Sequence, residues 1–175
     1  MADKEGTLAR DASRRVALVT GASRGIGRAV ACGLAADGFD VALVYAGNAD
    51  AAADAVAACE AAGATARAYR CDVSNADEVK ATVDAVLADF GSVWALVNNA
   101  GITRDTLLAR MKDEDFARVL DVNLTGAFNM MRALTRPLMR QCGGRIVSMS
   151  SVVGLMGNAG QANYAASKAG LIGLT

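Results

Sequence analysis

The sequence predicts an α/β protein built on a doubly wound parallel sheet in three layers. Short apolar runs, such as VALV at residues 16–19, alternate along the chain with Ala-rich stretches of helical length. Strands that are apolar on both faces and separated by helices indicate a parallel sheet covered on each side. A glycine-rich turn joins the first strand to the first helix, as doubly wound nucleotide-binding proteins require.

The individual elements follow from the same alternation. The predicted strands cover residues 15–20, 40–45, 65–71, 93–98 and 145–149. The predicted helices cover residues 26–37, 50–62, 76–90 and 113–139, and a last one runs from about residue 161 to the end. Pro137 should bend the long fourth helix, because proline lacks the N–H that a helix interior needs.

The chain length of 175 residues fits one domain, and we assign this domain to residues 14–175. Residues 1–13 are predicted to form a flexible polar leader. No apolar run approaches the roughly 20 residues that a membrane span needs, and the start lacks the apolar core of a signal peptide. A cytoplasmic location is therefore the default expectation.

Charge and residue usage exclude several functional classes. The 18 basic and 18 acidic residues balance, without a basic block, so neither nucleic acid nor a membrane surface is expected as a partner. The four cysteines form no Cys-x-x-Cys pair and histidine is absent, so no metal site is predicted. Without histidine, proton transfer in an enzyme would depend on Tyr, Lys, Asp, Glu or Ser.

The glycine-rich turn TGASRGIG occupies residues 20–27. Glycines let a ligand approach the backbone, and the next helix offers unpaired N–H groups to a pyrophosphate. Any strand-to-helix turn favours glycine, but this one follows the first strand of a βαβ unit, where the dinucleotide fingerprint lies. Its spacing, Gly-x3-Gly-x-Gly, differs from the more familiar Gly-x-Gly-x2-Gly. The predicted cofactor contacts here are Thr20, Gly21, Ala22, Ser23, Arg24, Gly25, Ile26 and Gly27.

The end of the second predicted strand bears on the choice of dinucleotide. An acidic residue there would bind the ribose 2′-hydroxyl, but residues 44–48 (VYAGN) contain no carboxylate. Arg24 could instead pair with a 2′-phosphate; the alternative is a solvated turn residue. The pattern favours NADP(H) over NAD(H).

Polar and small residues follow the next two strands, at the edge where a parallel sheet presents its ligands. Asp72 and Val73 follow the third strand, and the Asp72 carboxylate could lie near the adenine amino group. Asn99, Ala100 and Gly101 follow the fourth strand and suggest a small-residue floor beneath a cofactor. Alternatively, the asparagine stabilises the turn.

Tyr164 and Lys168 are the candidates for proton transfer. Their spacing places both on one helix face, where an ammonium favours the ionised form of a phenol. Such a phenol can exchange a proton with a carbonyl or alcohol oxygen. Ser151 is placed to hydrogen-bond the same oxygen, while Asn123 either kinks its helix or supports a proton relay toward Lys168. A Tyr–Lys pair alone is also typical of an ordinary amphipathic helix face. The catalytic interpretation therefore depends on the pair occurring together with the other motifs.

Together, these motifs resemble the classical branch of the short-chain dehydrogenase/reductases. The resemblance covers residues 15–175 and implies an NADP-binding Rossmann fold. Residues 101–105 (GITRD), 110–114 (RMKDE) and 151–164 are also similar to the 3-oxoacyl-(acyl-carrier-protein) reductases of bacterial fatty-acid synthesis.

The resemblance implies a role for each candidate residue. Tyr164 would donate the proton, Ser151 would orient the substrate carbonyl, and Lys168 would hold the nicotinamide ribose. Asn123 would anchor a water in the relay. The implied substrate is an acyl thioester on acyl carrier protein, and the implied assembly is a homo-oligomer, tetrameric in full-length relatives.

Two features depart from the family pattern. Asp72, Val73 and Asn99 match cofactor contacts, but a hydroxyl that some relatives carry after the second strand is replaced by Ala46. Members of the family also continue with a sixth strand, a substrate-covering segment and a seventh strand, whereas this sequence stops at Thr175. We therefore expect a C-terminally incomplete domain in which the fifth strand is an exposed edge.

Three functions are compatible with these observations. The first is NADPH-dependent reduction of 3-oxoacyl-(acyl-carrier-protein) to the 3-hydroxyacyl form in fatty-acid synthesis. The second is reduction of acetoacetyl-CoA or another β-keto substrate by a related enzyme. The third is a nucleotide-binding fragment without turnover.

Overall fold

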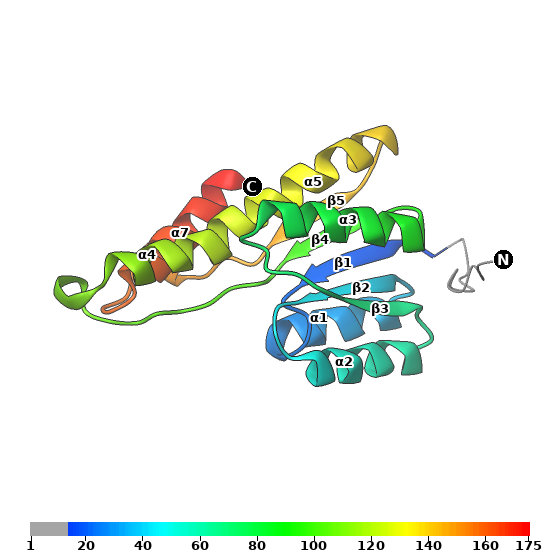
Figure 1. Ribbon diagram of the computed structural model, residues 1–175, viewed down its shortest axis with the longest axis horizontal. Coiled ribbons are helices and arrows are strands. Elements are labelled where there is room, and N and C mark those ends of the chain that lie inside the picture. Colours follow the sequence, from blue (N-terminus) through cyan, green and yellow to red (C-terminus); the bar gives the residue numbers. More distant parts are fainter. Residues whose placement is uncertain (1–13) are drawn as a thin grey trace.

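A computed structural model describes residues 14–175 and shows a five-stranded parallel sheet between two layers of helices (Figure 1). The leader predicted for residues 1–13 lies outside the described residues. The strands are β1 (Val16–Thr20), β2 (Asp40–Tyr45), β3 (Ala66–Arg70), β4 (Ala95–Asn98) and β5 (Arg145–Ser148). Their spatial order is β3-β2-β1-β4-β5, so the chain reverses direction across the sheet between β3 and β4. This is the doubly wound arrangement that the sequence predicts.

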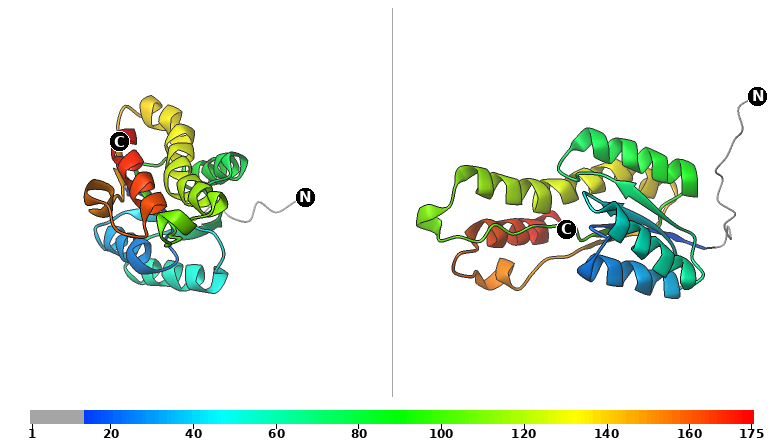
Figure 2. Two further views of the ribbon diagram at one scale, coloured as in Figure 1. Left: turned by 90° about the vertical axis from the view of Figure 1, so that its left-hand side faces the viewer. Right: turned by 60° about the horizontal axis from the view of Figure 1, so that its bottom comes forward.

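Helices cover both faces of the sheet (Figures 1 and 2). One face carries α1 (Gly25–Ala36) and α2 (Ala49–Ala61), and the other carries α3 (Ala76–Phe90) and α5 (Gly126–Arg140). The N-termini of α2 and α3 are capped by Asn48 and Asn75, whose side chains accept backbone N–H groups of the first turn. These caps explain why both helices begin where they do.

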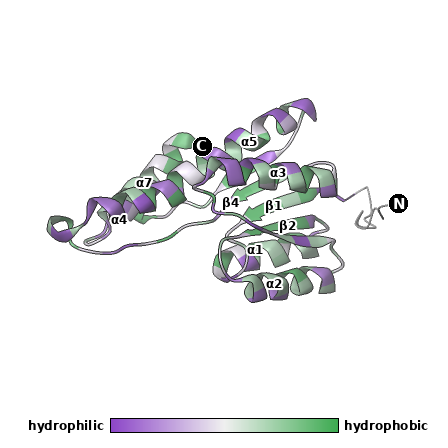
Figure 3. Ribbon diagram, in the orientation of Figure 1, coloured by the Kyte–Doolittle hydropathy of each residue, from purple (hydrophilic) through white to green (hydrophobic). Residues whose placement is uncertain are grey.

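The core lies in two layers because successive strand residues face opposite sides of the sheet. Val16 and Leu18 of β1 pack toward α3 and α5, with Phe90 and Leu134. Val19 packs on the other side, where the small residues of α1 and α2 allow a close approach. Figure 3 shows the apolar strands between helices with mixed polar and apolar surfaces. The central strands are therefore inaccessible on both faces, and ligands can reach the sheet at its ends.

The long helix predicted over residues 113–139 is interrupted. Helix α4 (Asp113–Leu120) passes into a π-helical stretch, η2 (Asp121–Thr125), before α5 begins. The departure from α-helical hydrogen bonding lies at residues 121–125. At Pro137, where the sequence predicts a bend, α5 continues as an α-helix to Arg140. Two short elements were not predicted, the 3₁₀ turn η1 (Leu108–Arg110) and helix α6 (Val153–Met156).

Helix α7 (Ala162–Leu174) lies beside α4 and forms a lobe that extends past the carboxyl ends of the strands (Figures 1 and 2). The connection after β4 is fixed to this lobe. Thr106 N–H donates to Gly160 O over 2.8 Å, and the Asn163 side chain donates to Arg104 O over 2.9 Å. These bonds hold the start of α7, and with it Tyr164, over the carboxyl end of the sheet.

β5 pairs with β4 and is an edge strand of the described sheet, as predicted; β3 forms the opposite edge. Its side chains alternate between exposed and half-buried, and Val147 is 48% exposed. Over residues 14–175, no helix combines the length and the apolar character that crossing a bilayer requires.

Candidate active site

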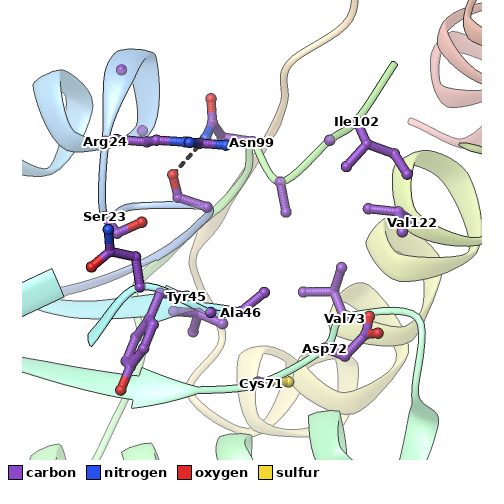
Figure 4. Close-up of a pocket in the computed structure, with 18 of the residues that line it drawn as sticks. Ser23, Arg24, Tyr45, Ala46, Cys71, Asp72, Val73, Asn99, Ile102 and Val122 are labelled. Atoms are coloured by element: carbon purple, nitrogen blue, oxygen red, sulfur yellow. Dashed lines mark hydrogen bonds between the residues drawn. The ribbon is translucent and has the colours of Figure 1, made fainter. Parts of the chain in front are cut away.

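A cleft of about 530 Å³ opens at the carboxyl ends of the strands (Figure 4). Its walls come from the glycine-rich turn after β1, the ends of β2, β3 and β4, and one side of α4 and η2. In Figure 4, Arg24 and Asn99 border the cleft opposite Asp72 and Val73. This is the topological switch point, between the neighbouring strands β1 and β4, where the strand order reverses and doubly wound proteins bind their ligands.

The glycine-rich turn has the geometry of a phosphate cradle. Gly21 and Gly25 have φ values of 65° and 55°, a left-handed backbone that favours glycine. Helix α1 begins at Gly25 and points its N-terminus into the cleft lining. A side chain at Gly27 would collide with Gly21 O and Asn99 Nδ2. The turn therefore fits a pyrophosphate group at a helix N-terminus, and these glycines keep its backbone accessible.

Gly27→Ala should destabilise the protein and weaken dinucleotide binding, because the added methyl group forces the turn away from Asn99. We expect a loss of about 1–3 kcal/mol in the free energy of unfolding. Gly33→Ala on the same helix is the matched control, since a Cβ there meets nothing within 4 Å. That control should be neutral or stabilising by about 0.5–1 kcal/mol. Equal effects of the two changes in denaturant unfolding would contradict the packing argument.

Thr20 and Asn99 lock the turn to the end of β4. Thr20 Oγ1 accepts from the backbone N–H groups of Asn99 and Ala100, both over 3.0 Å, and donates to Val97 O. The Asn99 amide donates to Thr20 O over 2.9 Å and to Gly21 O over 3.3 Å. Thr20 is buried and does not line the cleft. Its hydroxyl bonds backbone groups, so it supports the turn from below. The sequence left two roles open for Asn99, a surface beneath a cofactor or a support for the turn. In the structure Asn99 bonds the turn and also lines the cleft.

Most of the predicted cofactor contacts line the cleft, but Thr20 and Ala22 are buried and do not. Gly21, Ser23, Arg24, Gly25, Ile26, Gly27, Asp72, Val73, Asn99, Ala100 and Gly101 line the cleft. Ala22 is fully buried, and its N–H donates to Val44 O, which ties the turn to β2.

A second cavity, of about 460 Å³, contains the predicted proton-transfer pair. Tyr164 and Lys168 line it together, and Lys168 Nζ lies 5.6 Å from the centre of the Tyr164 ring. Five residues line both this cavity and the cleft: Arg24, Ile26, Asn99, Gly101 and Ile102. The two spaces are therefore adjacent parts of one site, joined along the glycine-rich turn and the β4 end.

Lys168 is almost completely buried at the edge of this cavity. It is 4% exposed, and Nζ donates to Met149 O over 2.6 Å. Burial penalises the charged form and lowers the pKa of the Lys168 ammonium below its ordinary value. A second hydrogen-bond acceptor, such as a ribose hydroxyl, would stabilise the ammonium here.

Ser151 is placed less directly than predicted. Its Oγ accepts from Val153 N–H over 3.2 Å at the start of α6, and the serine that lines the cavity with Tyr164 is Ser150. Ser150 Oγ donates to Lys168 O over 2.9 Å. The sequence signal was common to both serines, because Ser150 and Ser151 are the first two residues after the strand predicted over 145–149.

Asn123 lies in the π-helical stretch η2, which interrupts the α-helical hydrogen-bond pattern between α4 and α5. Its amide exchanges two hydrogen bonds with the Ile102 backbone, over 2.8 and 3.0 Å, and donates to Ser167 Oγ over 3.0 Å. Ser167 Oγ in turn donates to Tyr164 O. Asn123 thus connects η2 to the segment after β4 and to α7, while the relay toward Lys168 stays a prediction.

Sequence reasoning missed several lining residues. The residues at the end of β2 also border the cleft, and the general rule for strand ends could have found them: Tyr45, Ala46, Gly47 and Asn48. Arg118 and Val122 come from the α4–η2 segment, for which the sequence pattern gave no ligand signal. Within residues 14–175, no group of three or more His, Cys, Asp or Glu side chains is arranged to hold a metal ion.

Comparison with known proteins agrees with this geometry. The family model for short chain dehydrogenases matches residues 15–175. The chain belongs to this family. A 3-oxoacyl-(acyl-carrier-protein) reductase FabG from Staphylococcus aureus strain Mu50 is 53% identical over 159 residues, which are 91% of this chain and 65% of the relative. The corresponding reductase of Synechocystis is 53% identical, and FabG of Escherichia coli K12 is 47% identical, over 92% of this chain and 65% and 64% of the relatives.

Among solved structures, an NAD⁺-bound xylitol dehydrogenase superposes with a TM-score of 0.89 at 41% identity. The match covers 92% of this chain and 62% of that protein. The short chain dehydrogenase fold is thus shared over nearly the whole sequence. The chain spans about 65% of the length of these curated relatives.

Proposed function

We propose that this protein is an NADPH-dependent reductase that converts a 3-oxoacyl thioester on acyl carrier protein to the 3-hydroxyacyl thioester. The observation that carries the proposal is the continuity of the cleft with the cavity of Tyr164 and Lys168, through five shared lining residues. A dinucleotide with its pyrophosphate at the N-terminus of α1 can extend along this path and place its nicotinamide near Tyr164. The names of the relatives support the substrate class.

Each residue has a defined task in this reaction. When bound, the cofactor supplies the hydride that reduces the carbonyl carbon. Tyr164 gives its phenolic proton to the carbonyl oxygen as the alcohol forms, and Lys168 stabilises the phenolate by its charge. Ser150 or Ser151 is available to donate a hydrogen bond to the same oxygen. Asn123 keeps the catalytic helix in place through Ser167.

The choice of NADPH rests on the end of β2. The lining residues there, Tyr45, Ala46, Gly47 and Asn48, carry no carboxylate to repel a 2′-phosphate, and Arg24 lines the same cleft. An arginine can bind phosphate through two N–H groups at once.

Arg24→Ala should therefore weaken NADPH binding while leaving NADH binding nearly unchanged. Loss of a hydrogen bond to a charged group costs roughly 1.5–3 kcal/mol, which corresponds to about a 10- to 100-fold increase in Kd. Fluorescence titration of both cofactors measures the effect. An equal loss for NADH and NADPH would assign Arg24 to the turn and would contradict phosphate recognition.

Three assays on the same preparation test the proposed function. NADPH oxidation is followed with a 3-oxoacyl-(acyl-carrier-protein), with acetoacetyl-CoA, and with no acceptor. Faster turnover of the carrier-protein substrate is the expected result. Preference for the coenzyme A substrate would favour the related β-keto reductase. NADPH binding without turnover of either substrate would contradict the reductase proposal and support a nucleotide-binding protein without activity.

A further inference from the structure

Two buried side chains hold the backbone of Tyr164. The Tyr164 N–H donates to Asn163 Oδ1 over 2.8 Å, and Tyr164 O accepts from Ser167 Oγ over 2.8 Å. Asn163 and Ser167 are both completely buried, and neither lines the cleft or the cavity of Tyr164. The place of the phenol in its cavity therefore depends on side chains that the ligands in our proposal would not touch.

Asn163 supplies a bond that the start of α7 otherwise lacks. The first N–H groups of a helix have no partner within the helix, and Tyr164 is the third residue of α7. Gln161, in the capping position, makes no side-chain bond to this turn. The Asn163 side chain accepts the Tyr164 N–H instead. Removal of this acceptor would leave a backbone donor unpaired, which is unfavourable in a buried place.

The other end of the Asn163 amide reaches the segment after β4. Its Nδ2 donates to Arg104 O over 2.9 Å. Residues 101–104 line the cavity of Tyr164, and Gly101 and Ile102 also line the cleft. One buried amide therefore joins the backbone of Tyr164 to the segment that borders both spaces.

We propose that Asn163 is a positioning residue for proton transfer, which fixes the Tyr164 phenol relative to the segment 101–104 and thereby to a carbonyl placed beside the nicotinamide. This inference rests on the proposed reductase function. Proton transfer needs a donor and an acceptor about 2.6–3.2 Å apart, and a misplacement of about 1 Å can cost 10²-fold in rate. Asn163 acts through Tyr164 and has no part in holding the cofactor.

The first test separates kcat from cofactor binding in Asn163→Leu, which keeps a side chain of similar size and removes both hydrogen bonds. NADPH oxidation with a 3-oxoacyl-(acyl-carrier-protein) gives kcat, and fluorescence titration gives the Kd for NADPH. We expect kcat to fall about tenfold or more while Kd stays within about twofold of the parent. A Kd that rises by the same factor as kcat falls would assign Asn163 to the general architecture of the site and overturn the inference.

A double-mutant cycle tests whether Asn163 acts through the phenol. Asn163→Leu is measured in the parent and in the Tyr164→Phe background, where the residual rate no longer depends on the phenolic proton. The second background should lose less than about twofold, because residues that act as one unit have non-additive effects. A loss by the same factor in both backgrounds would contradict action through Tyr164.

Two controls separate positioning from a general loss of stability. Phe90→Leu opens space in the core at the end of α3, outside the cleft and the cavity. It should lower the midpoint of thermal unfolding and leave kcat unchanged. Asn158→Ala removes an exposed asparagine that bonds Gln161, and kcat should stay within about twofold. If Asn163→Leu does not fold, Asn163→Ser, whose shorter side chain loses the bond to Arg104, gives the same comparison.

The outcomes for the parent distinguish the two levels of the account. Turnover by the parent, together with an unchanged kcat in a folded Asn163 variant, would preserve the proposed function and overturn the inference. Absence of turnover by the parent would remove the proposed function and the inference together.

Discussion

Tyr164→Phe should reduce kcat for 3-oxoacyl thioester reduction by about 100-fold or more, with little change in NADPH affinity. The phenol is the ionisable group beside Lys168 in the cavity that adjoins the cleft, and removal of a positioned general acid typically costs 10²- to 10⁴-fold. The change removes one oxygen atom and keeps the aromatic ring. The packing of α7 should therefore be preserved.

The matched control is Tyr45→Phe, which removes the hydroxyl of another tyrosine that borders the joined site, at the end of β2. It should leave kcat within a few-fold of the parent. Steady-state NADPH oxidation gives kcat, and titration gives the cofactor Kd. Turnover of Tyr164→Phe within a few-fold of the parent would remove Tyr164 from the mechanism.

Lys168→Met should have the second large effect, a loss of kcat by about 100-fold or more together with weaker cofactor binding. Methionine retains much of the length and apolar volume of lysine and removes the charge. The double effect distinguishes Lys168 from Tyr164, because the ammonium is proposed to contact the nicotinamide ribose as well as to stabilise the phenolate. An unchanged cofactor Kd would contradict the ribose contact.

The same variant gives a prediction for stability against pH. Burial lowers the pKa of Lys168 in the folded protein below its ordinary value of 10.5. Between these two values the unfolded chain binds more protons than the folded chain, so the Lys168 contribution to the free energy of unfolding rises with pH. The parent should therefore gain stability relative to Lys168→Met as the pH rises toward 10.5. Denaturant unfolding of both proteins at several pH values measures the difference, and a difference that falls with pH would contradict the assigned burial.

The parts of the site that lie close together in the sequence were predictable. The glycines at 21, 25 and 27 predict a cradle because the turn needs a left-handed backbone and a close approach, and the structure has both. Tyr164 and Lys168 share a helix face because they are four residues apart. Each prediction uses only local geometry, which the sequence carries directly.

The parts that depend on the approach of distant segments were not predictable. Arg118 meets Asp72 only because α4 folds back over the end of β3. The π-helical stretch at 121–125 has no hydrophobic period of its own and was taken as part of one long helix. Likewise, Ser150 and Ser151 are neighbours in the sequence, and only the structure shows that Ser150 lines the cavity of Tyr164 while Ser151 Oγ accepts from Val153 N–H.

The most direct test of the central claim is hydride transfer itself. The protein is incubated with NADPH that carries deuterium at the transferable C4 position and with a 3-oxoacyl thioester on acyl carrier protein, and the product is examined by mass spectrometry. We predict a 3-hydroxyacyl thioester that has gained one deuterium at C3, with stoichiometric oxidation of NADPH. A protein that binds NADPH but forms no deuterated product would contradict the assignment of this site as a reductase.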